Sequence, residues 1–221
     1  VAVNPDGQLK RVKGDGLVIE VFNEGNISKL QGNMAIGHVR YTTADCKGEE
    51  NIQPFLFRHG TGDFAMANNG SIVNYSQLRS ELEDRGSLFC SSSDAEVLAH
   101  LIKKHGADSS RPRIEAIIEA LKQIDGAFAF VIMTKNRIYA CRDKYGFHPL
   151  ALAKLGDGYV VASETCAFDV LGAEYMRDIE PGEIVTIDHH GIRSSSYSAP
   201  ERHAMCAMEY VYFARPDSDI E

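Results

Sequence analysis

The stretch AFAFVIMT at residues 127–134, followed by Lys135-Asn136 and then by RIYACRD at residues 137–143, predicts a β-hairpin. From residue 127 onward the hydrophobic pattern has the period of two that is typical of strands. Two further hairpins are predicted downstream, one joining residues 150–155 to 159–163 and one joining residues 183–188 to 192–197. This part of the chain therefore predicts a meander of antiparallel strands.

Helical patterns precede the hairpins. Gly86 ends the helix predicted at residues 76–85, Gly106 ends the helix predicted at 93–105, and Pro112 begins the helix predicted at 112–124. The predicted helices cover residues 17–22, 76–85, 93–105 and 112–124, and the predicted early strands lie within residues 1–12, around the turn Pro5-Asp6-Gly7, and at residues 34–41 and 64–67. Strands, then helices, then strands again indicate an α+β layered domain rather than a parallel βαβ repeat.

Composition narrows the class of protein. The chain has 221 residues, of which 44% are hydrophobic and 24% charged, which suits one globular domain with a substantial core. Its longest apolar run, residues 127–133, is too short to span a bilayer, so we expect a cytoplasmic protein with no membrane partner. A net charge of −8 argues against a nucleic-acid partner. Five cysteines without a Cys-x-x-Cys pair argue against a disulfide framework and a self-contained zinc site.

Arg40 lies in the segment GHVRYTT at residues 37–43. Strand alternation places His38 and Arg40 on the same face. An arginine near the end of an apolar strand needs an anion, because a buried unpaired charge is costly. A substrate carboxylate held by two hydrogen bonds would meet this need. A structural salt bridge to one of the 31 acidic residues is the other interpretation, and the strand alone favours it slightly.

Three further positions are candidates for chemistry. The Asn69-Gly70 dipeptide could aim two neutral donors at one oxyanion, although Asn-Gly is first of all a common turn. Asp94 lies in the first turn of a predicted helix, in which Ser93 and Glu96 have capping-box spacing. Its carboxylate either caps the helix or binds the α-ammonium group of an amino acid. Cys206, ahead of a strand predicted at residues 208–213, is interpreted first as a packing thiol.

These segments resemble a known family. Together with RDKYGFHPL at residues 142–150, ASE at 162–164 and EYVYFARPDS at 209–218, they are similar in order and spacing to the glutaminase half of the amidophosphoribosyltransferases. The segments around Arg40, Asn69 and Asp94 resemble all class II (N-terminal-nucleophile, Ntn) glutamine amidotransferases. The segments at 142–150 and 209–218 resemble the purine enzymes in particular.

The resemblance implies a fold and a reaction. The expected fold is α+β, a four-layer α/β/β/α Ntn-hydrolase sandwich of two antiparallel sheets, here lacking its N-terminal nucleophile strand. We expect residues 1–221 to form one N-terminally incomplete glutaminase domain, with the C-terminal phosphoribosyltransferase domain absent. The implied transferase reaction hydrolyses glutamine and passes the ammonia to phosphoribosyl pyrophosphate. The product, 5-phosphoribosylamine, is the first committed intermediate of purine synthesis.

The resemblance also assigns roles to individual residues. Arg40 would hold the α-carboxylate of glutamine, and Thr43 would line the same pocket. Asp94 would bind the α-ammonium group. Asn69 and Gly70 would form the oxyanion hole.

The chain departs from the family pattern in three places. Family members begin with a cysteine that is the nucleophile and whose α-amine is its own base, whereas this chain begins with Val1. We therefore expect the chain as written to have no glutaminase activity. Asn68 stands where the family usually has histidine, and His148 where it usually has arginine.

Cofactors and partners follow from the resemblance as well. It implies glutamine as substrate, phosphoribosyl pyrophosphate and magnesium in the other half of the enzyme, a homo-oligomer at full length, and no cofactor held by this chain alone. In some members a cysteine at the position of Cys206 ligates a 4Fe-4S cluster together with three cysteines of the other half. The alternative function is that of a non-catalytic amino-acid-binding or regulatory relative. A different class II amidotransferase is a further alternative, against which the segment at 209–218 argues.

Overall fold

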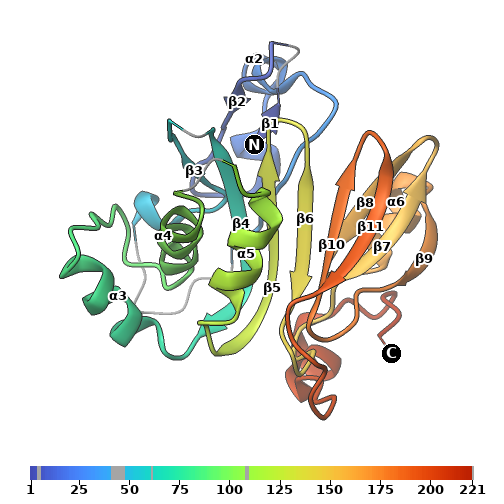
Figure 1. Ribbon diagram of the computed structural model, residues 1–221. Helices are drawn as coiled ribbons and strands as arrows, with labels where there is room; N and C mark the ends of the chain where they lie inside the picture. The colour runs from blue at the N-terminus through green and yellow to red at the C-terminus, as the bar shows by residue number, and fades with distance from the viewer. Residues whose placement is uncertain (4–5, 41–47, 61, 108–109, 221) are drawn as a thin grey trace. The chain divides into compact units, whose positions relative to one another are not determined.

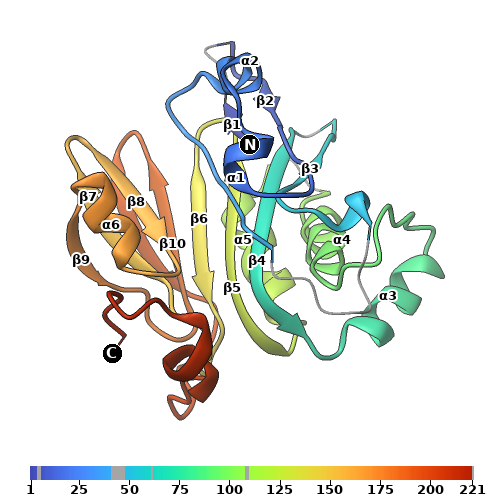
Figure 2. The ribbon, with the colours of Figure 1, turned by 180° about the vertical axis from the view of Figure 1, so that it is seen from behind.

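The computed structural model describes residues 1–3, 6–40, 48–60, 62–107 and 110–220 (Figures 1 and 2). Its contacts divide the chain into two compact units. Unit 1 comprises Val1–Asn68, Ile72–Asp125 and Val131–Ile138, and unit 2 comprises Asn69–Ser71, Gly126–Phe130 and Tyr139–Glu221, in each case within the described ranges.

Helices and strands alternate in the order expected for an α+β protein. The strands are β1 (Ala2–Val3), β2 (Leu9–Lys10), β3 (Phe55–Phe57), β4 (Phe64–Ile72), β5 (Gly126–Thr134), β6 (Ile138–Arg142), β7 (Ala151–Leu155), β8 (Gly158–Ala162), β9 (Glu174–Asp178), β10 (Glu183–Asp188) and β11 (Gly191–Ser196). The helices are α1 (Val18–Val21), α2 (Glu24–Ile27), α3 (Tyr75–Glu83), α4 (Ala95–His105), α5 (Arg113–Leu121) and α6 (Cys166–Leu171), with 3-10 turns η1 (Ser28–Leu30) and η2 (Glu49–Asn51) and the π-helix η3 (Glu209–Phe213). Each strand pair with a defined register is antiparallel. The predicted α+β class is confirmed.

In unit 1 the strands run in the order β5-β4-β3. Helices α4 and α5 lie on one face of β4, and the N-terminal segment with β1 and β2 lies on the other (Figures 1 and 2). Alternation along β4 explains this arrangement, because successive side chains point to opposite faces. The Phe64 ring lies below the Arg113 guanidinium of α5, whereas Ala65 packs with the N-terminal residues.

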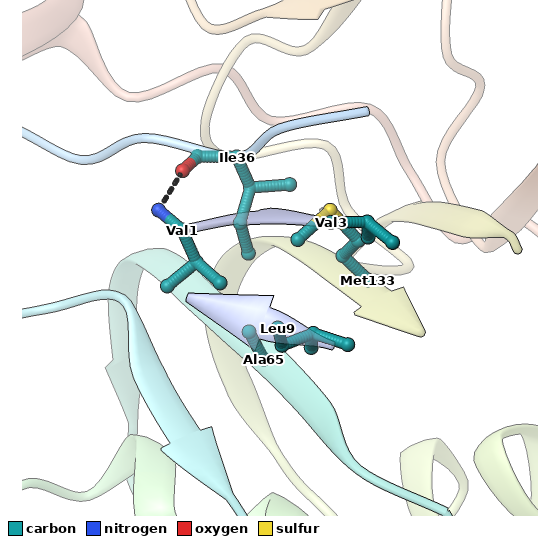
Figure 3. Packing of buried hydrophobic residues seen from close by; sticks show 6 residues of the cluster. All are labelled: Val1, Val3, Leu9, Ile36, Ala65 and Met133. Atoms are coloured by element: carbon teal, nitrogen blue, oxygen red, sulfur yellow. Dashed lines mark hydrogen bonds between the residues drawn. The ribbon is translucent and has the colours of Figure 1, made fainter. Parts of the chain in front are cut away.

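The N-terminal segment is held by a small apolar cluster (Figure 3). β1 pairs with β2, so the two predicted strands within residues 1–12 are confirmed. The Val1 nitrogen donates to the Ile36 carbonyl at 2.8 Å, and the Ile36 nitrogen donates back to Val1 at 2.9 Å. Each buried aliphatic side chain here contributes about 1.5–3 kcal/mol relative to exposure. The cluster is formed by Val1, Val3, Leu9, Ile36, Ala65 and Met133.

Two predictions near this cluster are wrong. The strand predicted at residues 34–41 is reduced, in its described part, to an isolated bridge between Ala35 and Ala2. Its partner β1 has only two residues, so there is no ladder to extend it. The predicted turn at Asn68-Asn69-Gly70 is also wrong, because β4 continues through it to Ile72.

Gly70 nevertheless has a φ of +124°, a conformation that residues with a side chain rarely adopt. A side chain at this position would overlap the carbonyl oxygen of Ala127. It would also lie 2.9 Å from Cδ2 of His148. Glycine is therefore required here by both backbone conformation and close packing.

Helices α3, α4 and α5 confirm three of the four predicted helices, and α1 confirms the fourth. The capping box predicted from Ser93 and Glu96 at the start of α4 is wrong, because Asp94 is the N-cap. Ser93 Oγ accepts from the Ala95 nitrogen at 3.3 Å, but Glu96 turns back toward the preceding loop. Its carboxylate accepts from the Cys90 nitrogen at 2.9 Å and from the Ser91 nitrogen and hydroxyl at 2.8 and 2.6 Å. A carboxylate that is only 2% exposed needs these donors.

These contacts predict a pH-dependent contribution to stability. Burial raises the pKa of Glu96, but the His100 ring at 3.7 Å and the hydrogen bonds from Ser91 and Cys90 outweigh it, so the pKa lies below its usual value. The stabilisation is full above about pH 4.3, where the unfolded carboxyl is ionised, and is lost as the pH falls through the lower folded pKa. Glu96→Gln should lower the free energy of unfolding at pH 7 by about 1–3 kcal/mol.

The measurement is urea unfolding of the intact protein that contains this chain, between pH 3 and pH 8. The difference between Glu96→Gln and the parent should shrink below about pH 4.3. Glu24→Gln, at an exposed position, is the control and should leave the midpoint unchanged. A difference that stays constant over the whole range would contradict the assignment.

Unit 2 contains the strands in the order β11-β10-β6-β5 and a three-stranded sheet in the order β8-β7-β9. Helix α6 packs on the smaller sheet through Phe168, which contacts Ala151 and Ala153 of β7. The predicted hairpins β7–β8 and β10–β11 are confirmed. In the β5–β6 connection, the Thr134 nitrogen donates to the Arg137 carbonyl at 2.8 Å, which closes the turn of the first predicted hairpin. β9 and α6 were not predicted.

The strand predicted at residues 208–213 is wrong. This segment forms the π-helix η3, which is closed by a hydrogen bond from the Ala214 nitrogen to the Glu209 carbonyl at 3.0 Å. Glu209 is buried and binds His148, while the side chains of Tyr210 and Val211 are exposed. The partly buried contact of Glu209 with His148 at the start of η3 accompanies the π-helix, although the apolar alternation of the segment predicted a strand.

Two buried charged side chains hold the loop that follows β6. The Arg142 guanidinium donates to the carbonyls of His148, Ile179 and Gly146 at 2.7, 3.0 and 3.0 Å. The neighbouring Asp143 carboxylate accepts from backbone nitrogens of Tyr145, Phe147 and Phe128, at 2.9, 3.1 and 3.3 Å. The loop therefore has a fixed course that depends on both charges.

Candidate functional site

Asp94 is the first of the candidate residues whose geometry the structure defines. It is the N-cap of α4, and its Oδ1 accepts from the Ala95 nitrogen at 2.8 Å. Its Oδ2 accepts from the nitrogen of Ile72, the last residue of β4, at 2.6 Å. Burial raises the pKa of Asp94, and these hydrogen bonds oppose the shift. The carboxylate thus caps the helix and is fixed at the end of β4.

The backbone of Asn68 in β4 is held from two sides. The Asn68 nitrogen donates to Oε1 of Gln53 at 2.7 Å, and Nε2 of His38 lies 3.1 Å from the Asn68 carbonyl oxygen. A carbonyl oxygen can only accept, so Nε2 carries the proton in this contact. Burial, and to a smaller extent the charge of Arg40, lower the pKa of His38, although the bond to Asn68 opposes this.

His38 is therefore a neutral imidazole at physiological pH, and its Nδ1 is an acceptor. In the part of the chain that the structure describes, this buried Nδ1 has no hydrogen-bond partner. Such an atom is available to a donor on a ligand or a water molecule.

Arg40 lies two residues after His38 in the sequence, and its side chain is half-buried. Its charge is close enough to His38 to lower the pKa of that imidazole. Thr43, the other residue assigned to the carboxylate pocket, lies outside the described residues, as do Tyr41 and Thr42.

Asn69 and Gly70 lie in β4, between Asn68 and Ile72. The strand residues before and after them are thus bound by His38 and by Asp94, respectively. In unit 2, Gly70 lies against Ala127 and His148, as described above.

Sequence reasoning missed two contacts around β4. It gave no role to Gln53. It also did not pair His148 with Glu209, although Nδ1 of His148 lies 2.7 Å from Oε1 of Glu209 in a partly buried contact. Both members of the pair fall within segments that carry the resemblance. No local pattern could join residues 61 positions apart in the chain.

The thiols do not form a metal centre by themselves. Cys206 is partly exposed, and its nitrogen donates to the Phe147 carbonyl at 3.0 Å. Among the described residues no group of three or more His, Cys, Asp or Glu side chains is placed to hold a metal ion. A 4Fe-4S cluster needs four thiolates, so these residues alone do not fit one. Burial raises the pKa of the Cys141 thiol to about 12, which makes it unreactive.

Comparison with known proteins gives clear similarities. Residues 38–170 match the family model described as a glutamine amidotransferase domain. The amidophosphoribosyltransferase of Bacillus subtilis (strain 168) is 49% identical over 221 residues, which cover 99% of this chain and 46% of that protein. The chloroplastic amidophosphoribosyltransferase 1 of Arabidopsis thaliana is 42% identical, over 100% of this chain and 38% of its own length. The chain thus spans less than half the length of these curated relatives.

Solved structures agree. Glutamine phosphoribosylpyrophosphate (PRPP) amidotransferase from B. subtilis, complexed with ADP and GMP, superposes with a TM-score of 0.92 at 48% identity, over 99% of this chain and 47% of that chain. The allosteric regulatory enzyme of purine biosynthesis superposes with a TM-score of 0.90 at 50% identity, over 95% of this chain and 44% of that chain. The expected α+β Ntn-hydrolase fold is confirmed by these similarities.

Among the helices that the structure describes, none has the length and apolar character needed to cross a membrane. The family match extends over more than half of the chain, and it includes His38, Arg40, Asn69, Gly70 and Asp94. On this match, the chain belongs to the family of glutamine amidotransferase domains.

Proposed function

We propose that this chain is the glutaminase part of an amidophosphoribosyltransferase. It would hydrolyse glutamine and supply ammonia to phosphoribosyl pyrophosphate, giving 5-phosphoribosylamine in the first step of purine synthesis. The observation that carries this proposal is the position of Asp94, whose carboxylate is fixed by Ile72 at the end of the strand that contains Asn69 and Gly70. The 49% identity with the B. subtilis amidophosphoribosyltransferase supports it.

The proposed roles follow from the charges of glutamine. Arg40, with Thr43 beside it in the sequence, would bind the α-carboxylate, and Asp94 would bind the α-ammonium group. The amide of Asn69 and the N–H of Gly70 would donate to the oxygen of the side-chain amide as it becomes an oxyanion. These residues bind and polarise glutamine, and the attacking cysteine implied by the resemblance is not one of them.

The proposal extends to partners, cofactors and domains. Residues 1–221 would act as one glutaminase domain, the ammonia acceptor would be phosphoribosyl pyrophosphate with magnesium, and the intact protein would be a homo-oligomer. Cys206 would ligate an iron–sulfur cluster only together with cysteines from outside this chain. The thiols of Cys90, Cys141, Cys166 and Cys206 are free, which supports a cytoplasmic location.

The first test is ammonia release from glutamine by the intact protein, measured with Asp94→Asn. This change keeps the shape of the side chain but removes the charge that the α-ammonium group requires. It also replaces one of the two oxygens that accept from Ala95 and Ile72 with an NH2 group. The KM for glutamine should rise roughly tenfold or more, since a hydrogen bond to a charged group contributes about 1.5–3 kcal/mol. Asp84→Asn, an exposed carboxylate at the end of α3, is the matched control and should leave KM unchanged.

Two outcomes would count against the proposal. Equal KM values for the parent and Asp94→Asn would remove Asp94 from the glutamine site. Binding of glutamine without ammonia release by the intact parent protein would favour the alternative, a non-catalytic amino-acid-binding relative.

A further inference from the structure

Unit 1 contains a cavity of about 500 Å³ that none of the residues assigned to glutamine lines. It lies between the β3–β4 hairpin and helices α4 and α5, on the helix-covered face of β4. Its volume falls within the range of roughly 300–1,000 Å³ that is typical of small-molecule sites. Asp94, His38 and the Asn69-Gly70 pair are not part of it, so the cavity requires an explanation of its own.

The cavity is cationic in an acidic protein. The chain has 31 acidic and 23 basic residues, yet none of the residues that line the cavity is Asp or Glu. The side chains with basic groups in its wall are Arg58, His59, His100, Lys103, Arg111 and Arg113. Such a local concentration of one charge in a recess attracts ions of the opposite sign.

Acidic neighbours offset this charge only in part. Arg58 forms an ion pair with Asp63, Arg111 lies 3.4 Å from Glu115 in an exposed pair, and Nε2 of His100 lies 3.7 Å from Glu96. None of the ion pairs among the described residues includes Lys103. The cavity therefore keeps a net positive charge at its rim.

Part of the cavity wall is aromatic and aliphatic. The rings of Phe57 and Phe64 stack with centroids 5.1 Å apart and planes inclined by 28°. Ile102 of α4 and Ala116 of α5 complete the apolar wall. The Arg113 guanidinium lies 5.7 Å from the centroid of the Phe64 ring. Burying a flat apolar group against the apolar side chains is favourable, and the cations in the same wall select a ligand that also carries negative charge.

We propose that this cavity binds a small organic anion, with an aromatic body against Phe57 and Phe64 and a phosphate or carboxylate group at Lys103 and Arg111. An inorganic anion would leave the rings of Phe57 and Phe64 in contact with water. A neutral aromatic molecule would leave the cations without a partner. Only a ligand with both parts matches both surfaces.

Cys90 provides a site-specific test, because its exposed thiol lines the cavity. The intact protein is alkylated with iodoacetamide, and labelling of each cysteine is followed by peptide mass spectrometry. The probes are 1-naphthyl phosphate, 1-naphthoate, 1-naphthol and inorganic phosphate. At about ten times its Kd, a bound naphthyl anion should slow labelling of Cys90 about tenfold. Alkylation of glutathione under the same conditions is the control and should be unaffected by the probes.

The four probes separate the alternatives. Stronger protection by 1-naphthyl phosphate than by 1-naphthoate would identify a phosphate site, and the reverse would identify a carboxylate site. Equal protection by 1-naphthol would show an apolar crevice without anion selectivity and would overturn the proposal. Protection by inorganic phosphate alone, or by none of the probes, would overturn it as well.

A pair of neighbouring lysines tests the role of charge. Lys103→Gln should raise the Kd of the protecting naphthyl anion about two- to fivefold, as expected for a partly exposed ion pair, and the effect should weaken in high salt. Lys104→Gln, the next residue of α4, removes the same charge at an exposed position outside the cavity and should leave the Kd unchanged. Equal effects of the two variants would show a general charge effect and contradict the proposed site.

Discussion

Gly70→Ala is expected to lower the free energy of unfolding of the intact protein by roughly 2–5 kcal/mol, through strain and overpacking together. The φ of +124° at this position is one that residues with a side chain rarely adopt. The added methyl group would overlap the carbonyl oxygen of Ala127 and lie 2.9 Å from Cδ2 of His148. Backbone on one side and a buried ring on the other leave little room for adjustment.

Urea unfolding at pH 7 measures this effect. Gly60→Ala is the matched control, because a methyl group there would enter open space and Gly60 does not have a positive φ. The control should change stability by no more than about 0.5 kcal/mol. If Gly70→Ala were as stable as the control, the close approach of β4 to Ala127 would be wrong.

Arg142→Met is expected to be about as damaging, at roughly 3–5 kcal/mol, because it removes a buried charge around which other groups are arranged. The methionine fills a similar volume but donates no hydrogen bond. The carbonyls of Gly146, His148 and Ile179 would each lose their guanidinium donor in an environment where Arg142 is only 2% exposed.

Thermal and urea unfolding of the intact protein should both show this loss, and Arg142→Lys should recover only part of it, since an ammonium group cannot reach three carbonyls at once. Arg202→Met, at an exposed position, should have no effect on the midpoint. Full stability of Arg142→Met would mean that the loop after β6 is held by Asp143 alone.

Local sequence patterns correctly predicted the helices and strands that begin or end at a recognisable turn, glycine or proline. The β5–β6 hairpin combines period-two alternation with a polar two-residue turn, and both features act within a few residues. Helix α4 ends at its C-cap Gly106, the turn after α3 contains Gly86, and α5 begins after Pro112. These elements formed where predicted because neighbouring residues decide them.

Two wrong predictions of local structure, the turn at Asn69-Gly70 and the strand at residues 208–213, involve contacts with residues that are distant in the sequence. Asn69-Gly70 is a strong turn signal, but β5 lies beside β4 and extends the strand through it. The segment that begins at Glu209 alternates like a strand, yet the buried contact with His148 accompanies a π-helix there. Neither partner can be identified from the local pattern.

In the candidate site, too, local features could be predicted from the sequence, whereas contacts between distant residues could not. Charge and strand position suggested Arg40 and Asp94, each with a structural alternative, and the structure shows that Asp94 does cap its helix. What the sequence could not reveal is that the same carboxylate also binds Ile72 of β4. The lowered pKa of His38 likewise depends on the burial of its ring, which no spacing predicts.

The central claim is that Arg40 and Asn69 act on glutamine in different ways, one by binding it and the other by stabilising the oxyanion. Steady-state ammonia release by the intact protein, with both variants measured side by side, tests this most directly. Arg40→Lys should raise KM about tenfold with little change in kcat, because a point charge replaces a two-pronged donor. Asn69→Ala should lower kcat about 10²–10³-fold with little change in KM, because its donor is needed only as the oxyanion forms. A rise in KM at unchanged kcat for Asn69→Ala, or a neutral Arg40→Lys, would contradict the account.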